Sequence, residues 1–281
     1  SLLDKAVKEV FSKAKKRPVF KGEQKGVFCG ERTELLSYKG SAFVKITEGC
    51  DNCCSFCAIP LIRGRLRSRS SDDIIAEIKH LLKNGVFEIN LIGQDLAAYG
   101  CGKDDAEFSD KKDWHSIMYS QLARPVIEEK NFTEVNGKSP LYELIEKITK
   151  LKGSFWVRLL YIHPDHFNPD VLELIQKDQR ILPYFDIPFQ SGDDDIIKAM
   201  NRKGSFKSYS KLVKTIRKAL PESCIRTTFL TGFPGEKEEN AENTVRFLQS
   251  IKSDWSGCFD YSREDDTAAY KMKGRVAHKV A

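Results

Sequence analysis

The feature that most constrains the fold of this chain is the alternation of short apolar runs with helical patterns along its 281 residues. Each run is rich in β-branched or aromatic residues, and a segment with apolar side chains at helical spacing follows it. The expected strands are residues 42–46, 87–92, 156–162, 184–187, 225–230 and 257–261. The expected helices are residues 72–83, 140–151, 169–176, 194–200, 209–219 and 238–251. This alternation predicts βαβ units that build a parallel sheet.

The number of βαβ units limits which architectures are possible. Six strands are too few for a closed eight-stranded barrel, so an incomplete barrel and an open doubly wound sheet are the two α/β arrangements left. We expect this domain to occupy residues 40–281, and we interpret residues 1–39 as the remnant of an N-terminal domain and its linker. Residues 100–138 form a charged connection far longer than the usual length of about 2–6 residues. They indicate a surface insertion or, alternatively, a lid or partner-docking loop.

A polar or glycine-containing segment follows every expected strand. In chain order these are the cysteine loop at 50–57, residues 94–95, His163, Gln190, residues 232–236, and Ser262 with Glu264. Because the carboxyl ends of parallel strands meet at one edge, where α/β proteins build their sites, we expect these residues to share one rim. Gly232 and Gly235 would let a ligand approach the backbone closely.

Half of the eight cysteines crowd into the loop after the first strand. They are Cys50, Cys53, Cys54 and Cys57, whereas Cys29, Cys101, Cys224 and Cys258 are scattered and are interpreted as buried or inert thiols. Clustered cysteines in a chain of this size favour metal binding or catalysis over disulfides. Zinc, in a zinc-binding nucleic-acid module, is the alternative, but paired zinc motifs usually stand about 15–20 residues apart. So tight a loop suits an iron–sulfur cluster better, with three or four of the cysteines as ligands.

The loop and its flanks resemble a known family. Residues 49–57 (Gly-Cys-Asp-Asn-Cys-Cys-Ser-Phe-Cys), with residues 59–60 and 63–65 after them, are similar to the cluster loop of radical S-adenosylmethionine (SAM) enzymes, above all the methylthiotransferase branch. The resemblance continues through residues 157–161, 186–190 and 232–236. It implies an incomplete TIM-like (βα)6 barrel of the radical SAM type. It also implies a 4Fe-4S cluster whose catalytic metal ligands are Cys50, Cys54 and Cys57, with Cys53 at a variable position and SAM on the open iron.

The resemblance further implies which residues bind SAM. Phe56 matches the aromatic residue before the last cysteine, and the cofactor pocket would be lined by Gln94, Arg158, Gln190, Arg226 and Gly232. Local capping or pairing is the alternative role for these polar side chains. In the family, SAM cleavage yields a 5′-deoxyadenosyl radical, and sulfur comes from a second cluster. Full-length members hold that cluster in an N-terminal domain and also carry a TRAM domain, neither of which we recognise here, since residues 1–39 contain only Cys29.

Several segments bear on the substrate. Residues 94–95, 158–161 and 261–264 resemble the RimO type, which adds a methylthio group to the β-carbon of an aspartate in the twelfth small-subunit ribosomal protein. Residues 163–164 and 190–192 also occur in the MiaB type, which modifies an adenosine of transfer RNA. We expect the RimO type, with the MiaB type as the alternative. The implied partners are the ribosomal protein or the ribosome, and an electron donor such as flavodoxin or ferredoxin.

Charge and hydropathy add three expectations. The net charge of +6 is modest, and no apolar run is long enough to span a bilayer, so we expect a cytoplasmic protein without a membrane segment. Arginines alternate at Arg63, Arg65, Arg67 and Arg69. In an extended segment they would all lie on one side, where they would either contact phosphates or form a solvated edge.

The histidines show no metal-ligand spacing with the cysteine loop. Residues 193–195 are interpreted as acids that stabilise the start of a helix.

Overall fold

The computed structural model describes residues 38–101, 137–277 and 279. The strands are β1 (Ser41–Lys45), β2 (Thr47–Glu48), β3 (Arg67–Ser68), β4 (Glu88–Ile92), β5 (Trp156–Leu159), β6 (Ile181–Asp186), β7 (Cys224–Thr231) and β8 (Trp255–Asp260). The helices are α2 (Ile59–Arg63), α3 (Ser71–Lys83), α5 (Pro140–Thr149), α6 (Leu172–Lys177), α7 (Asp194–Ala199), α8 (Phe206–Ala219) and α9 (Glu238–Ile251), with short 3-10 turns at Pro169–Val171 and Ala269–Lys271. Residues 1–37 and most of the 100–138 segment lie outside the described residues, so the interpretations of both remain expectations.

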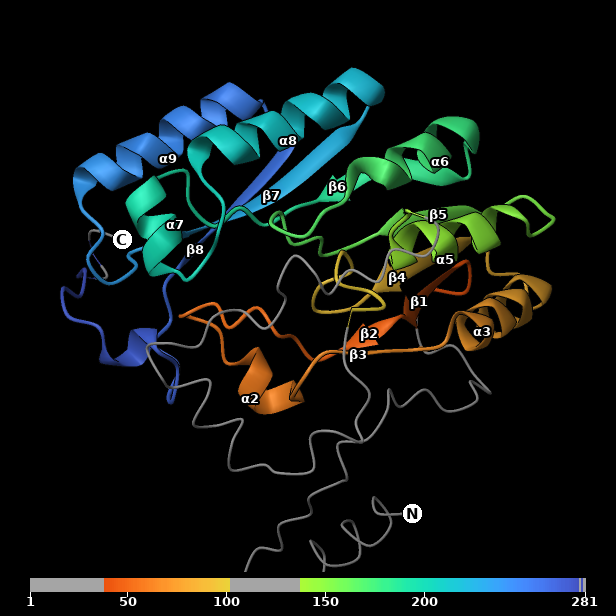
Figure 1. The fold of residues 1–281 in the computed structure, drawn as a ribbon, viewed down its shortest axis with the longest axis horizontal. Helices are drawn as coiled ribbons and strands as arrows, with labels where there is room; N and C mark the ends of the chain where they lie inside the picture. Colours follow the sequence, from red (N-terminus) through yellow and green to blue (C-terminus); the bar gives the residue numbers. More distant parts are fainter. Residues whose placement is uncertain (1–37, 102–136, 278, 280–281) are drawn as a thin grey trace, which may run out of the picture.

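Six strands form one sheet in the order β1-β4-β5-β6-β7-β8. Every neighbouring pair in this sheet is parallel. Strands β1 and β8 are its two edges, and helices α3, α5, α6, α8 and α9 cover one face of the curved sheet (Figure 1). A doubly wound sheet would carry helices on both faces. The fold is therefore the expected incomplete (βα)6 barrel.

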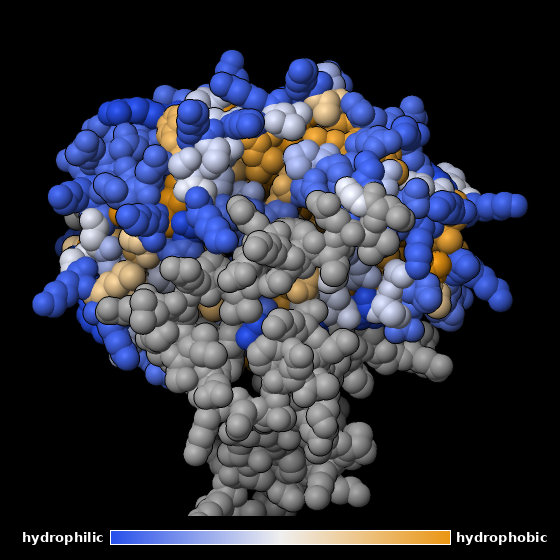
Figure 2. Space-filling model, in the orientation of Figure 1, coloured by the Kyte–Doolittle hydropathy of each residue, from blue (hydrophilic) through white to orange (hydrophobic). Residues whose placement is uncertain are grey.

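Strand residues alternate between the two faces of this sheet. Those that face the helices, such as Val44, Leu91 and Phe185, are buried in one continuous core. Their neighbours on the inner face, such as Phe43 and Trp156, are about half exposed, at 48% and 51%. On the outside, hydrophilic side chains cover most of the helices and apolar ones show between them (Figure 2). The inner face and the carboxyl edge of the sheet are therefore the two parts of the barrel where a ligand would bind.

Each expected strand and helix is present, and the differences lie at the ends. The strand expected at 156–162 stops at Leu159, because Tyr161 adopts a φ of 63°, which an extended strand does not allow. The strand expected at 184–187 begins earlier, at Ile181. The antiparallel pair β2–β3 and helix α2 were not expected, because elements of two and five residues are too short to show a period.

Close packing between α9 and the loop before α7 yields a stability prediction. A Cβ atom added to Gly192 would lie 2.2 Å from Phe247 Cβ, whereas one added to Gly257 would have its nearest neighbour at 3.7 Å. We expect Gly192→Ala to lower the free energy of unfolding by about 1–3 kcal/mol through overpacking. Gly257→Ala is the matched control and should change it much less. Chemical denaturation measures both, and equal stabilities for the two variants would contradict this packing.

Candidate active site

The loop that carries the four clustered cysteines lies between β2 and α2 and is fixed from two sides. On one side, the Asp51 carboxylate accepts two hydrogen bonds from the Arg65 guanidinium, at 2.8 and 3.0 Å. On the other side, the backbone N–H of Ser55 donates to the carbonyl of Met200 at 3.1 Å, just after α7. Asn201 Nδ2 also donates to the carbonyl of Cys53, at 2.9 Å. The loop thus joins the segment after α2 to the segment after α7.

Ionisation of the loop thiols is unfavourable, because they are desolvated and lie near carboxylates and one another. Burial, followed by Asp95 and the neighbouring thiols Cys54 and Cys57, raises the pKa of Cys50 well above its ordinary value. Burial and then Cys54 raise the pKa of Cys57 to about 11. Cys53 has a left-handed backbone with a φ of 49°, and burial, followed by Asp51, raises its pKa to about 12. These thiols need positive charge beside them to ionise.

This requirement fits an iron–sulfur cluster, whose iron ions stabilise buried thiolates. In the part of the chain that the structure describes, the one group of three ligating side chains with donor atoms within 4.8 Å of one another is Asp95, His163 and His166. None of the loop cysteines belongs to that group.

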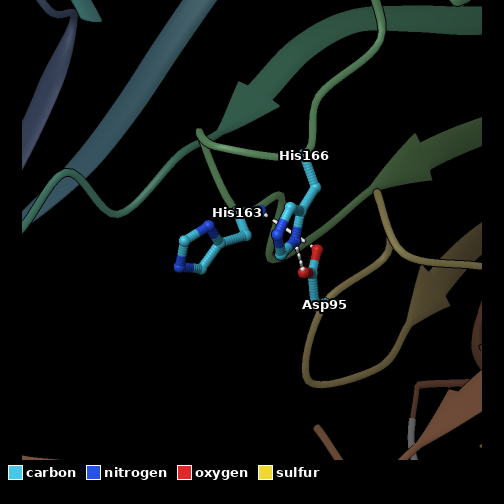
Figure 3. A group of neighbouring side chains, drawn as sticks. All are labelled: Asp95, His163 and His166. Carbon is cyan, nitrogen blue, oxygen red and sulfur yellow. Dashed lines mark hydrogen bonds and ion pairs between the residues drawn. The ribbon is translucent and has the colours of Figure 1, made fainter. Parts of the chain in front are cut away.

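The buried carboxylate of Asp95, at the end of β4, organises the site (Figure 3). It accepts hydrogen bonds from His166 Nδ1 at 2.8 Å and from the backbone N–H of His163 at 3.2 Å. Asn52 Nδ2 and the backbone N–H of Ala97 also donate to it, both at 3.0 Å. Although burial acts in the opposite direction, the His166 hydrogen bond and its neighbours hold the pKa of Asp95 well below its usual range. With four donors on its two oxygens, Asp95 orders the cysteine loop rather than ligating a metal.

His163 connects this network to the cysteines. Its ring stacks on His166 with centroids 4.9 Å apart, and its Nε2 lies 3.9 Å from Cys54 Sγ. Burial and the Arg202 charge lower the pKa of His163 to about 3, so the ring is neutral at physiological pH. Sequence spacing gave no reason to link His163 to the loop, because 109 positions separate it from Cys54. In the sequence, the sign that His163 belongs to the site was its position after the third expected strand, on the predicted rim.

Arg202 is a site residue that sequence reasoning missed. Its side chain is only 8% exposed, and its Nη1 donates to the carbonyls of Pro188 and Phe189 at 2.6 and 3.2 Å. Its Nε has no hydrogen-bond partner among the described residues. Burial raises the pKa of Cys54, and the Arg202 charge opposes that effect. A basic residue just after a helix is ordinary in sequence, so nothing marked this one.

The expected cofactor residues near the loop occupy distinct environments. Phe56 packs beside Phe233 in a small apolar cluster. Gln94 follows β4, and its side-chain oxygen is buried without a partner among the residues described. Gln190 has a left-handed φ of 71° and pairs through its backbone with β7. Gly232, with a φ of 72°, donates its N–H to the carboxylate of Glu236.

Arg158 and Arg226 lie along their strands rather than at the carboxyl ends. Arg158 forms an ion pair with Glu88 at 2.8 Å and stacks over the Tyr184 ring at 4.7 Å. Arg226, the third residue of β7, forms an ion pair with Asp186 at 2.8 Å. Both therefore occupy the inner face, engaged with neighbouring strands, and their assignment to the cofactor pocket remains a prediction.

The predicted arginine stripe is wrong for three of its members. Arg65 is held by Asp51, Arg67 donates to the carbonyls of Arg65 and Arg63, and Arg69 forms an ion pair with Glu77 at 2.5 Å. The segment is not continuously extended, because Arg63 ends α2 and Arg67 begins β3. Arg65 therefore fixes the cysteine loop through Asp51, whereas Arg67 and Arg69 bind to residues 63–65, to Lys45 and to Glu77.

The acidic run at 193–195 has the structural role expected of it. Asp193 caps α7 by accepting hydrogen bonds from the backbone N–H groups of Asp195 and Ile196. At the last expected rim position, Ser262 donates to Glu264 at 2.7 Å, and both side chains are exposed. No helix in the described part of the chain is long and apolar enough to cross a membrane.

Comparison with solved structures supports the fold. The chain aligns with a radical S-adenosylmethionine methyltransferase, TsrM from Kitasatospora setae, with a TM-score of 0.53 and 14% identity over 85% of this chain and 41% of that one. It aligns with the cobalamin-dependent S-adenosylmethionine radical enzyme OxsB with a TM-score of 0.51 and 12% identity, over 83% of this chain and 29% of that one. At such identities the likeness concerns the fold alone.

Comparison of sequences identifies the family. A ribosomal protein uS12 methylthiotransferase RimO from Treponema denticola is 49% identical over 265 residues, which cover 92% of this chain and 52% of that protein. The corresponding protein from Natranaerobius thermophilus is 37% identical over 85% of this chain and 47% of its own length. The chain thus spans about half the length of these relatives. Residues 44–248 match the family model of the radical SAM superfamily, and the chain belongs to that superfamily.

Proposed function

We propose that residues 40–281 form the radical SAM domain of a methylthiotransferase that modifies an aspartate of ribosomal protein uS12. The observation that carries the proposal is the 49% identity to a RimO protein across 92% of this chain. Membership of the radical SAM superfamily implies a 4Fe-4S cluster and SAM. We therefore interpret the cysteine loop as a cluster site rather than as part of a zinc-binding nucleic-acid module.

Cys50, Cys54 and Cys57 would hold the cluster as thiolates. These three side chains are partly buried, and Arg202 supplies a positive charge beside Cys54. When bound, the cluster supplies an electron that cleaves SAM and so provides a radical able to abstract hydrogen from an unreactive carbon. Asp95 would keep the loop in one geometry through its bonds to Asn52 and the two histidines.

SAM would lie against the carboxyl edge and the inner face of the sheet. The unpartnered oxygen of Gln94 offers a buried acceptor there. Gly232 and Gln190, both with positive φ, turn the backbone at the ends of neighbouring strands, where a ligand meets main-chain groups. Phe56 would form an apolar wall beside the loop. Arg158 and Arg226 would reach a bound ligand only from the inner face, in exchange for their present carboxylate partners.

The complete reaction would draw on more than this domain. Insertion of sulfur would use the second cluster that the family holds in a further domain, and the electron would come from a flavodoxin or ferredoxin. A ribosomal substrate would place the reaction in the cytoplasm. The residues described here would therefore perform the radical step, and the parts of the relatives that this chain does not span would perform the rest.

The test of substrate uses the whole protein that contains this chain. A strain that lacks the corresponding gene should regain a methylthio group on the uS12 aspartate when the intact gene is restored, as measured by mass spectrometry of the ribosomal protein. A version with Cys50, Cys54 and Cys57 replaced by Ala is the control and should restore nothing. Methylthio mass on transfer-RNA adenosine with uS12 unchanged would refute the proposal in favour of the MiaB type.

A further inference from the structure

The three expected ligand sulfurs differ in their hydrogen-bond donors. For Cys50 and Cys57 the backbone N–H groups two residues further along the chain, those of Asn52 and Ile59, act to lower the pKa of the thiol. Cys54 instead faces two side chains from distant parts of the chain, His163 after β5 and Arg202 after α7. The fold therefore directs side-chain donors to one of the three sulfurs.

The orientation of His163 makes it a donor to this sulfur. Its Nδ1 accepts a hydrogen bond from the backbone N–H of Asp165 at 3.3 Å. A neutral imidazole that accepts at Nδ1 carries its proton on Nε2, and Nε2 is the atom that lies 3.9 Å from Cys54 Sγ. Stacking on His166, which Asp95 holds, fixes the plane of the ring.

Arg202 adds charge at the same place. The carbonyls of Pro188 and Phe189 anchor one guanidinium nitrogen, Nη1, while Nε has no partner among the described residues. The guanidinium is 8% exposed and forms no ion pair in the described part of the chain, and its positive charge acts first on Cys54 and then on Tyr209 and Asp165. Burial strengthens this interaction, since the surrounding dielectric is low.

We infer that His163 and Arg202 form a donor pair on the Cys54 sulfur that raises the reduction potential of the iron–sulfur cluster. Reduction adds negative charge to a cluster and its sulfurs, so hydrogen bonds and positive charge at a sulfur stabilise the reduced form more than the oxidised form. The pair makes the cluster easier to reduce by a physiological donor. The inference rests on the cluster of the proposed function and identifies two positioning residues outside the cysteine motif.

The test measures the potential of the reconstituted cluster by EPR-monitored redox titration of this chain. His163→Phe keeps a ring to stack on His166 but has no N–H, and Arg202→Met removes the charge. In each variant we expect about a tenfold lower ratio of reduced to oxidised cluster at a fixed potential, which is a shift of about 59 mV to more negative values. Arg202→Lys should recover part of that shift. Arg246→Met, which removes an exposed charge from α9, is the matched control and should leave the potential unchanged.

Variants that bind a full complement of iron with an unchanged potential would overturn the inference. If a variant fails to assemble the cluster, a measurement on the wild-type protein decides: with ¹⁵N-labelled histidine, the reduced cluster should show a ¹⁵N hyperfine coupling, and its absence would overturn the role of His163. Wild-type protein that binds no cluster at all would instead refute the proposed function, so the two failures are distinct.

Discussion

Cys54→Ala protein should bind less than one iron per chain after anaerobic reconstitution, whereas the wild type should bind about four. Cys50→Ala and Cys57→Ala should behave in the same way, because each would remove one of only three protein ligands. SAM cleavage should be lost with the cluster, and 5′-deoxyadenosine should fall to the level of a protein-free blank. Iron analysis, the visible absorption of the cluster and chromatography of the nucleoside measure these losses.

Cys53→Ala is the matched control within the same loop. Its side chain is buried whereas the other three are partly buried, its backbone has the left-handed φ of 49°, and its carbonyl is held by Asn201. Removal of its sulfur should leave about four irons per chain. If Cys53→Ala loses the cluster while Cys50→Ala keeps it, the ligand assignment is wrong.

Asp95→Asn should be among the most destabilising single changes in this chain. The amide that replaces the carboxylate offers an N–H where His166 and Asn52 both donate, so these two buried donors would lose their acceptor. We expect a loss of about 2–5 kcal/mol in the free energy of unfolding at pH 7, because each buried donor left without an acceptor costs about 1–3 kcal/mol. Asp72→Asn, at a side chain that is 90% exposed, is the control and should cost well under 1 kcal/mol.

The pH dependence gives the same prediction a second test. The pKa of Asp95 is lower in the folded chain than the value of about 3.9 in an unfolded one, so its stabilising effect is complete above that value and is lost as the pH falls. The difference in unfolding free energy between wild type and Asp95→Asn should therefore shrink below about pH 4. A difference that stays constant between pH 7 and pH 3 would show that folding does not lower the pKa of Asp95.

The sequence predicted the sheet well because the sheet depends on local patterns. Runs of apolar residues, such as those around Val44 and Leu91, indicate a strand from local sequence alone, and both side chains are buried in the structure. The alternation of such strands with helices then predicts a parallel sheet. The cysteine loop was visible for a similar reason, since its members lie within eight residues. In the structure the six expected cofactor residues lie near the carboxyl edge or on the inner face. The sequence could not show that two of them, Arg158 and Arg226, have carboxylate partners on adjacent strands.

What the sequence could not reveal depends on long-range contacts. His163 and Arg202 reach Cys54 only because strands far apart in sequence end at one edge, and neither residue stands in a recognisable spacing to the loop. The arginines at 63–69 were misjudged for the opposite reason. Their regular spacing suggested an exposed stripe, but the acidic partners Asp51 and Glu77 lie outside that segment and engage Arg65 and Arg69 within the domain.

The bonds between the cysteine loop and the residues after α7 have a consequence for synthesis of the chain. Asn201, which holds the carbonyl of Cys53, is 148 positions further along the chain. At translation rates of about 5–20 residues per second, the loop is made roughly 7–30 s before this contact can form. During that interval its thiols are exposed to oxidants on the nascent chain. We therefore expect iron to enter after most of the barrel has been translated, and growth under oxygen should lower the cluster content of new protein before it affects protein already folded.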